Sequence, residues 1–398
     1  MELALAALWK RQRVLRPTAR RAWGILACQL ADFADAEAVA AARAAWWDQA
    51  LLKRAPVLST APGVPRVPVC YGAASQYGLT LAQPLSAAAF YHYFRFARED
   101  IPRLRAALRI PLEFHTSQRD HIDGEEGLLL FLRRMAYPGT LLSLERFFGR
   151  SSGPISRIFE VVRQHLEPVA LKITATFDAQ RLVPLLPTFA TAVIAKGCPL
   201  PFVWAFVDGT QNAFCRPGED GYDGLAQEVQ FNGHTRTHGF QWQNVETPDG
   251  IIIEMHGPFS GTTHDARALR ESGLLNRCAL YAKRGNVIYY MFGDKGYPRS
   301  PSLQTPIMNP VPGSVGENFN QTMSKMRISV EWSNGKILLL WAYADFKKNL
   351  KLGLQPVASY YRIATLLTNC HTCLYGSQTG QYFQVPAPDL EDYLKNAF

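Results

Sequence analysis

The segment FVWAFVDGT (Phe202–Thr210) is a short apolar and aromatic run that carries Asp208 and is closed by Gly209. Runs of this length, rich in β-branched and aromatic residues and bounded by glycine, predict buried strands. A carboxylate at the end of a buried strand is costly unless a metal ion, a cation or hydrogen-bond donors compensate its charge. The segment therefore predicts a buried strand that carries a functional acid.

Two later acids occupy comparable positions. Asp294 ends a second apolar run, NVIYYMFGD (Asn286–Asp294), and Glu331 lies in a polar, helix-like stretch, FNQTMSKMRISVEW (Phe319–Trp332). Two aspartates at strand ends and one glutamate on a helix can converge as a set of oxygen ligands. Such a set suits a hard divalent ion, Mg²⁺ or Mn²⁺.

Composition narrows the class of protein. The chain has 398 residues, enough for two or three domains, and its 47% hydrophobic content excludes a disordered protein. No apolar run reaches the ~18 residues of a membrane span. The net charge of +9 favours a polyanionic partner, nucleic acid before an anionic membrane surface. Seven scattered cysteines and no signal-peptide pattern indicate a reducing compartment.

We expect four parts along the chain. Residues 1–115 form a helical N-terminal region with a proline-rich linker, and 116–195 a helix-turn-helix module. Residues 196–380 form a mixed α/β domain, and 381–398 a loosely held acidic tail. The basic stretch Trp9–Trp23 is a nuclear localisation or phosphate-binding patch, an organelle transit peptide, or a solvated helix face.

The helix-turn-helix interpretation rests on three helical patterns, at 125–136, 141–148 and 155–166, with a tight turn before the last. The third helix is expected to expose Arg157, Arg163 and Gln164 to phosphates and base edges. The predicted DNA contacts in this module are Arg150, Ser152, Arg157 and Arg163. A small helical bundle without a DNA-binding role is the alternative.

The mixed α/β domain begins with the strand at 202–208. Strands at 235–246 and 250–255, joined by the turn signal Pro248–Gly250, form a hairpin. A loop at 261–269 opens into a helix, and helical stretches from 317 to 368 are interrupted at Gly335. The order of these elements predicts a sheet with helices on both faces.

The motifs of this domain, in their order, closely resemble the DDE-type endonuclease domain of PIF/Harbinger transposases. They are VDGT at 207–210, CRP at 215–217, FNGHTRTHGFQWQNVETPDG at 231–250, HGPFSGTTHDA at 256–266, GDKGYP at 293–298 and FNQTMSKMRISVEW at 319–332. The resemblance covers roughly residues 200–370 and implies an RNase H-like mixed sheet flanked by helices, preceded by an all-α region with a helix-turn-helix. It assigns the catalytic, metal-holding triad to Asp208, Asp294 and Glu331.

The chemistry that the resemblance implies is metal-dependent cleavage, and joining, of DNA phosphodiester bonds. Two Mg²⁺ or Mn²⁺ ions activate the attacking oxygen and stabilise the leaving oxygen, and no covalent enzyme nucleophile is needed. Lys295 and Arg327 are expected to bind phosphate. The resemblance further implies transposon-end DNA and a Myb-like DNA-binding protein as partners, a nuclear location, and oligomers. The alternative is a domesticated DNA-binding or scaffold protein without cleavage, and a weaker one is a nuclease for RNA or hybrid duplexes.

Three further features remain open at this point. Asp265, in the THDA motif, is a candidate fourth acid near the metals, or else the motif caps a helix. His234, Arg236 and His238 alternate along one strand and line either the DNA path or an ordinary polar face. Cys370 and Cys373 form a single C-x-x-C pair, which is a weak zinc signal within an apolar helix.

Overall fold

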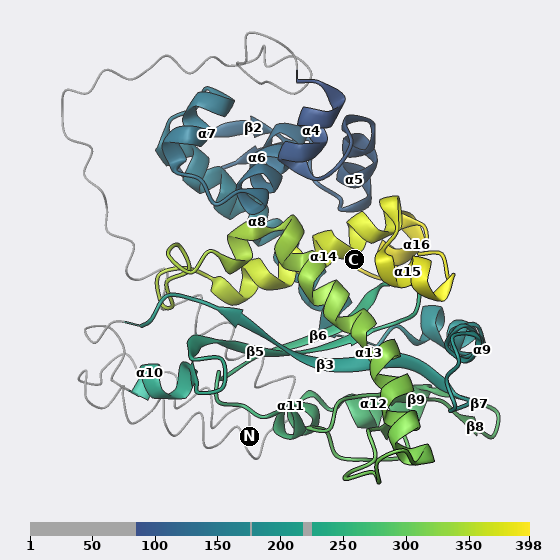
Figure 1. The fold of residues 1–398 in the computed structure, drawn as a ribbon. Coiled ribbons are helices and arrows are strands. Elements are labelled where there is room, and N and C mark those ends of the chain that lie inside the picture. The colour runs from purple at the N-terminus through teal and green to yellow at the C-terminus, as the bar shows by residue number, and fades with distance from the viewer. Residues whose placement is uncertain (1–84, 176, 218–224) are drawn as a thin grey trace, which may run out of the picture. The chain divides into compact units, whose positions relative to one another are not determined.

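The computed structural model describes residues 85–398 except 176 and 218–224 (Figure 1). All of these residues lie in one compact unit of the chain, Val57–Phe398. The predictions for the basic stretch Trp9–Trp23 and for the proline-rich linker concern residues outside the described part. No helix among the described residues combines the length and the apolar character needed to span a bilayer.

The first described part is mainly helical. Its elements are α4 (Ala87–Phe94), η2 (Arg98–Asp100), α5 (Ile101–Ala107), β1 (Glu113–His115), β2 (His121–Asp123), α6 (Gly124–Ala136), α7 (Leu141–Phe148), α8 (Ser152–Ala175) and α9 (Ala179–Ala195). The three predicted helices are present as α6, α7 and α8. The region is not all-α, because the antiparallel hairpin β1–β2 precedes α6.

Local chemistry explains where these helices begin and end. Asp123 caps α6 by accepting hydrogen bonds from the backbone N–H groups of Glu125 and Glu126. Thr140 caps α7 in the same way, and Gly149 ends it in the left-handed conformation that glycine adopts without strain. The third helix, α8, is 24 residues long, twice the predicted span, because its apolar residues continue to pack beyond Leu166.

A mixed sheet follows. Its strands are β3 (Val203–Ala213), β4 (Phe231–Asn232), β5 (Thr237–Glu246), β6 (Ile252–Phe259), β9 (Tyr290–Phe292) and β10 (Leu303–Gln304). The order is β10-β9-β3-β5, and both β4 and β6 pair with β5. The central strand β3 is parallel to β9 and antiparallel to β5. The predicted hairpin is confirmed, because β5 pairs with β6 in antiparallel register.

The apolar run suggests that the central strand ends at Asp208, but the strand is longer. It continues to Ala213 because β5 pairs with it along Asp208–Ala213. Two adjacent residues of β5 show that both faces of the sheet are covered. The Trp242 ring lies 5.3 Å from the Tyr361 ring of α14 (Val357–Tyr375), while Gln243 donates a hydrogen bond to Ser272 of α11 (Asp265–Ser272). Since neighbouring strand residues point to opposite faces, α14 and α11 lie on opposite sides (Figure 1).

The remaining described elements complete the domain. They are α10 (Leu225–Gln230), α12 (Leu274–Tyr281), β7 (Lys283–Arg284), β8 (Val287–Ile288), α13 (Val315–Leu340), η3 (Ala342–Asp345), α15 (Gln378–Phe383) and α16 (Leu390–Leu394). The predicted break at Gly335 is wrong, because α13 runs through this residue to Leu340. The expectation of a loose tail is also wrong, since Leu390, Tyr393 and Leu394 are buried.

Candidate functional site

Asp208 lies within β3, and Asp294 lies two residues beyond the end of β9, the parallel strand beside it. Phe206 of β3 is in register with Phe292 of β9, and each aspartate follows two residues later. Neighbouring parallel strands keep equal steps in register, so the two carboxylates emerge side by side. Their charges interact, because Asp294 contributes to raising the pKa of Asp208.

Asp265 joins these two acids from the first turn of α11. A Cβ atom at Gly209 would lie 2.3 Å from its Oδ1, so the carboxylate packs against β3 where the strand has no side chain. A Cβ atom at Gly296 would lie 3.1 Å from Asp265 Oδ2 and 3.0 Å from Asp294 Oδ1. The two carboxylates therefore approach the same point, and both glycines are needed for that approach.

The capping alternative for the THDA motif is not what the structure shows. His264 occupies the N-cap position of α11 but makes no side-chain capping hydrogen bond. Asp265 instead accepts a long hydrogen bond of 3.4 Å from Nε2 of Gln241 on β5. Its carboxylate is turned toward the other acids, which favours the interpretation as a fourth acid.

Glu331 lies on α13, as predicted, and connects to Asp208 through Arg327. Nη1 of Arg327 is 3.1 Å from Asp208 Oδ1, and its Nη2 is 2.7 Å from Glu331 Oε1. The Glu331 side chain is 51% exposed, whereas that of Asp208 is 16% exposed. One acid is thus held in the sheet, and the other reaches in from solvent.

The electrostatics of Asp208 reflect this crowding. Burial raises its pKa to about 7, Arg327 opposes the rise, and the charges of Asp294, Glu331 and Asp265 add to it. Burial and Asp294 likewise raise the pKa of Asp265. The buried hydroxyl of Tyr297, which sequence reasoning missed, has no hydrogen-bond partner and a raised pKa, from burial first and then from the three aspartates. Its only sequence signal is its place in GDKGYP.

The arrangement fits a divalent cation in its donor set and charge. All four acids offer oxygen, the ligand that hard cations such as Mg²⁺ and Mn²⁺ take. The ligand atoms of these acids are not all within 4.8 Å of one another. Among the described residues, the group of three that meets this spacing is Glu113, His115 and His121. The acids therefore converge without closing to ligand spacing, and Arg327 bridges two of them.

The arginines predicted to contact DNA from the helical module are engaged within the protein. Arg157 binds Asp120 with Nε 2.5 Å from Oδ2, and Arg150 binds Glu126 with Nε 3.0 Å from Oε1. Arg163 is only 4% exposed, which contradicts its predicted exposure. It forms ion pairs with Glu160 and Glu167 of its own helix.

The other residues predicted to contact DNA lie in four different settings. The Ser152 hydroxyl bonds to Glu145 within the module. Arg236 lies in the turn between β4 and β5 with a φ of 53°, so the predicted alternation with His238 along one strand is wrong. His238 packs against Phe231, with ring centroids 5.1 Å apart. Lys295 is exposed directly beside Asp294.

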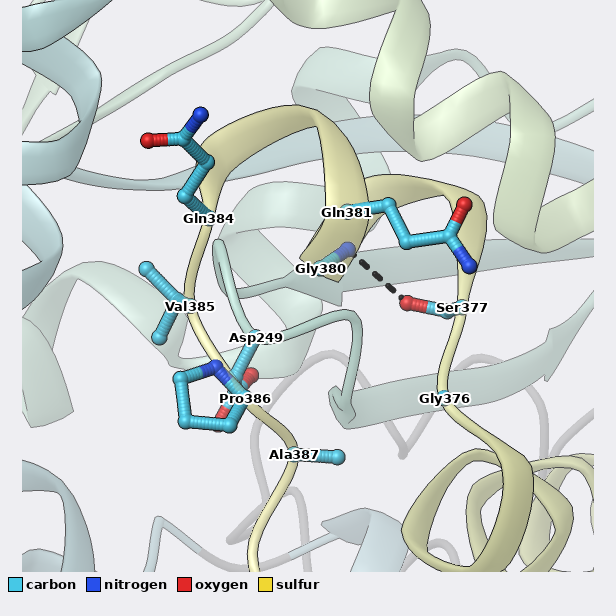
Figure 2. A pocket seen from close by; sticks show the side chains of 9 residues that line it. All are labelled: Asp249, Gly376, Ser377, Gly380, Gln381, Gln384, Val385, Pro386 and Ala387. Atoms are coloured by element: carbon cyan, nitrogen blue, oxygen red, sulfur yellow. Dashed lines mark hydrogen bonds between the residues drawn. The ribbon is translucent and has the colours of Figure 1, made fainter.

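Two other features are structural. Cys370 is fully buried in α14 and, like Cys373, is a free thiol. Figure 2 shows a pocket of about 180 Å³ between the β5–β6 turn and the segment Gly376–Ala387. Its one acid, Asp249, is satisfied by Thr247, the Ile251 backbone and Arg181. Asp208, Asp265, Asp294 and Glu331 do not line this pocket. The pocket lies where the C-terminal segment packs on the domain, away from the candidate site.

The region that carries the acids is also the region that matches a known family. Residues 207–369 match the model of the DDE superfamily endonucleases. The match supports a DDE transposase-like nuclease, and the mixed sheet flanked by helices is consistent with a DDE nuclease fold. DDE endonuclease domains generally use divalent metal ions. No curated protein and no solved structure gives a significant match.

Proposed function

We propose that this protein is a metal-dependent DNA endonuclease of the PIF/Harbinger transposase type, with an RNase H-like catalytic domain. Asp208, Asp294 and Glu331 would hold two Mg²⁺ or Mn²⁺ ions, with Asp265 as a fourth acid. The observation that carries the proposal is the convergence of Asp208, Asp265 and Asp294 beside the central strand β3, within the segment that matches the endonuclease family.

The electrostatic state of Asp208 supports this assignment. A buried carboxylate among three other acids has Arg327 as its ion-pair partner, and its pKa is raised to about 7. Strongly perturbed carboxylates in such clusters are typical of functional sites. Bound divalent ions would offset the repulsion, activate the attacking oxygen and stabilise the leaving oxygen.

The chain's own residues have separate tasks in this proposal. Asp208, fixed in the central strand, would supply a ligand oxygen from a rigid position. Arg327 neutralises Asp208 and Glu331 before metal binding and is then available to a phosphate oxygen. Lys295, exposed beside Asp294, offers a second cation to the DNA backbone.

The wider setting belongs to the same proposal. The basic chain, with its net charge of +9, would act on transposon-end DNA in the nucleus, together with a Myb-like DNA-binding protein and as an oligomer. We retain the helix-turn-helix role of α6–α8 as part of it. Because Arg150, Arg157 and Arg163 are held in internal ion pairs, other side chains of that module would have to make most of its phosphate contacts.

The test is cleavage of labelled DNA duplexes that carry transposon ends, with Mg²⁺ or Mn²⁺ and with a candidate Myb-like partner. Wild type is compared with Asp208→Asn, Asp294→Asn and Glu331→Gln, which keep side-chain size. Asp392→Asn, at an exposed acid of α16, is the matched control.

Metal-dependent cutting that is lost in the three site variants and kept in the control supports the proposal. Cutting that survives all three substitutions refutes the site assignment. Tight, salt-dependent DNA binding without cutting supports the alternative, a domesticated DNA-binding or scaffold protein. RNA and hybrid duplexes in the same assay test the remaining substrate classes.

A further inference from the structure

The hairpin β1–β2 carries two histidines and a glutamate that the nuclease site does not use. We propose that Glu113, His115 and His121 form a separate binding site for a transition-metal ion of the Zn²⁺ class. The site lies in the helical module, and the proposal does not depend on the nuclease activity.

The register of the hairpin places the three side chains on one face. His115 pairs directly with His121 across the two strands, and Glu113 is two residues from His115 on the same strand. Alternate residues of a strand share a face, so all three project together. Phe114 and Ile122, at the intervening positions, are 5% and 1% exposed and anchor the opposite face in the core.

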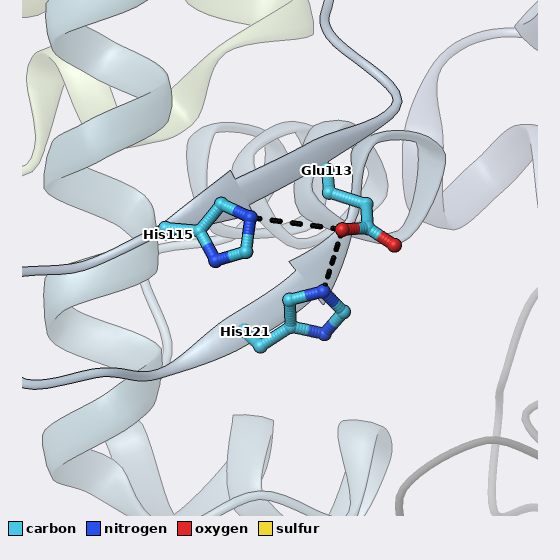
Figure 3. Close-up of side chains that lie close together, drawn as sticks. All are labelled: Glu113, His115 and His121. Carbon is cyan, nitrogen blue, oxygen red and sulfur yellow. Dashed lines mark hydrogen bonds and ion pairs between the residues drawn. The ribbon is translucent and has the colours of Figure 1, made fainter.

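The ligand atoms are already close to the spacing that a metal requires. Figure 3 shows the two imidazole rings converging on Glu113, with Oε2 2.7 Å from Nε2 of His121 and 3.6 Å from Nε2 of His115. Tetrahedral ligands at ~2.1 Å from Zn²⁺ lie roughly 3.4 Å from one another. One ligand atom from each of the three residues lies within 4.8 Å of the others, so small side-chain rotations suffice.

The hairpin is braced as a metal site requires. Asp120, in the hairpin turn, accepts a hydrogen bond of 2.6 Å from the Thr116 hydroxyl and forms an ion pair with Arg157 of α8. Arg150 donates a hydrogen bond of 3.1 Å to the backbone carbonyl of His121 while it is paired with Glu126. Pre-organised ligands lose less conformational entropy on binding, so this bracing favours affinity. The bracing also gives a role to two arginines that the sequence suggested for DNA.

The donor set selects the class of metal. Imidazole nitrogen suits Zn²⁺, Cu²⁺ and Ni²⁺, whereas Mg²⁺ and Ca²⁺ prefer oxygen. Two histidines and one carboxylate leave one tetrahedral position for water, the ligand set of open zinc sites. The two metal sites of the molecule would thus differ in chemistry, hard ions at the aspartates and a borderline ion at the hairpin.

The test is calorimetric titration of the full, chelator-treated chain, with Zn²⁺ as the titrant. The buffer contains excess Mg²⁺, which competes for the acids of the proposed nuclease site. Wild type is compared with His115→Ala, His121→Ala and Glu113→Gln. His234→Ala removes an exposed histidine elsewhere and is the matched control. The His115 and His121 side chains are 66% and 43% exposed, so their replacement leaves the core intact, which far-UV circular dichroism verifies.

We expect one Zn²⁺ per chain at this site, with affinity reduced about tenfold or more in each histidine variant and unchanged in the control. Zn²⁺ should also raise the melting temperature of wild type more than that of His121→Ala. Equal Zn²⁺ affinity and stoichiometry in wild type and in both histidine variants would overturn the proposal. An Asp208→Asn protein should bind Zn²⁺ as wild type does, which separates this result from the fate of the nuclease proposal.

Discussion

Arg327 and Asp208 form an ion pair with Nη1 3.1 Å from Oδ1, and the same guanidinium holds Glu331. The arginine therefore stands between two acids that the nuclease proposal assigns to metal ions. Binding of a cation to both acids requires Arg327 to leave at least one of them, so arginine and metal compete.

Replacement of Arg327 should strengthen metal binding while it weakens catalysis. In Arg327→Ala we expect Mn²⁺ to bind about tenfold more tightly, because the competing cation is gone. Cleavage should fall because the phosphate loses a charged partner. Calorimetry with Mn²⁺ and the duplex assay measure the two effects. Lys325→Ala, at an exposed lysine of the same helix, should change neither, and unchanged Mn²⁺ affinity in Arg327→Ala would contradict the competition.

The raised pKa of Asp208 predicts a pH-dependent stability of the metal-free protein. The folded-state pKa is about 7 and the usual value is 3.8, so the folded state binds this proton more tightly than the unfolded state. Protonated Asp208 therefore adds to the free energy of unfolding. This contribution is complete below pH ~4, is lost as pH rises through about 7, and amounts to about 4 kcal/mol in all. Asp208→Asn removes this loss.

Urea denaturation in the presence of a chelator measures this effect. At pH 8 we expect Asp208→Asn to be more stable than wild type, and at pH 4 the difference should shrink. Added Mn²⁺ should stabilise wild type at pH 8 more than the variant. Asp392→Asn serves as the control. Parallel stability curves for wild type and Asp208→Asn would show that Asp208 titrates normally.

Gly209 tests the place of Asp265. A Cβ atom here would lie 2.3 Å from Asp265 Oδ1 and 2.8 Å from Gln241 Nε2, so Gly209→Ala must displace the carboxylate. Displacement by about 1 Å can cost ~100-fold in rate, and we expect a loss of that order in DNA cleavage. Gly233→Ala, where an added Cβ meets nothing within 4 Å, is the control. Full activity in both Gly209→Ala and Asp265→Asn would exclude Asp265 from the chemistry.

Arg163 should be important for stability rather than for DNA binding. It is 4% exposed, between Glu160 and Glu167, and Nη1 lies 2.8 Å from the Ser359 hydroxyl of α14. Removing one partner of a buried ion pair costs ~3–5 kcal/mol, and because Glu160 and Glu167 are 40% and 24% exposed we expect Arg163→Ala to lose about 3 kcal/mol or less. Gln164→Ala, exposed on the same helix, should change stability by about 0.5 kcal/mol or less. A stable Arg163→Ala protein with weakened DNA binding would restore the predicted contact.

Sequence reasoning found the elements that local pattern specifies. The apolar run before Asp208 is a strand, the turn Pro248–Gly250 joins a hairpin, and Glu331 lies on a helix. The convergence of Asp208 and Asp294 was also expected, since each follows an apolar run that predicts a buried strand. Whether these acids act as proposed stays a prediction.

What the sequence could not show depends on tertiary contacts. Arg157 pairs with Asp120, 37 residues away, so its exposure could not be predicted from its own helix. Gly335 is a helix breaker by propensity, but packing of α13 on both sides of it, through Ser333 and Ile337, overrides that preference. The strands β1 and β2 have three residues each, too few for a periodic signal, so the hairpin escaped notice.

The position of Asp208 in a strand paired on both sides has a consequence for the choice between ions of different size. β5 pairs with Asp208 itself and β9 pairs with the strand up to Phe206, so the backbone of Asp208 is held in the sheet, whereas the half-exposed Glu331 on α13 has room to change rotamer. Mg²⁺ needs ligands at ~2.0–2.1 Å in a strict octahedron, and Ca²⁺ accepts ~2.3–2.6 Å with variable geometry. If these acids hold the ions as proposed, adjustment to the ionic radius would fall to the glutamate, and we expect the length of that side chain to determine which ions support cleavage.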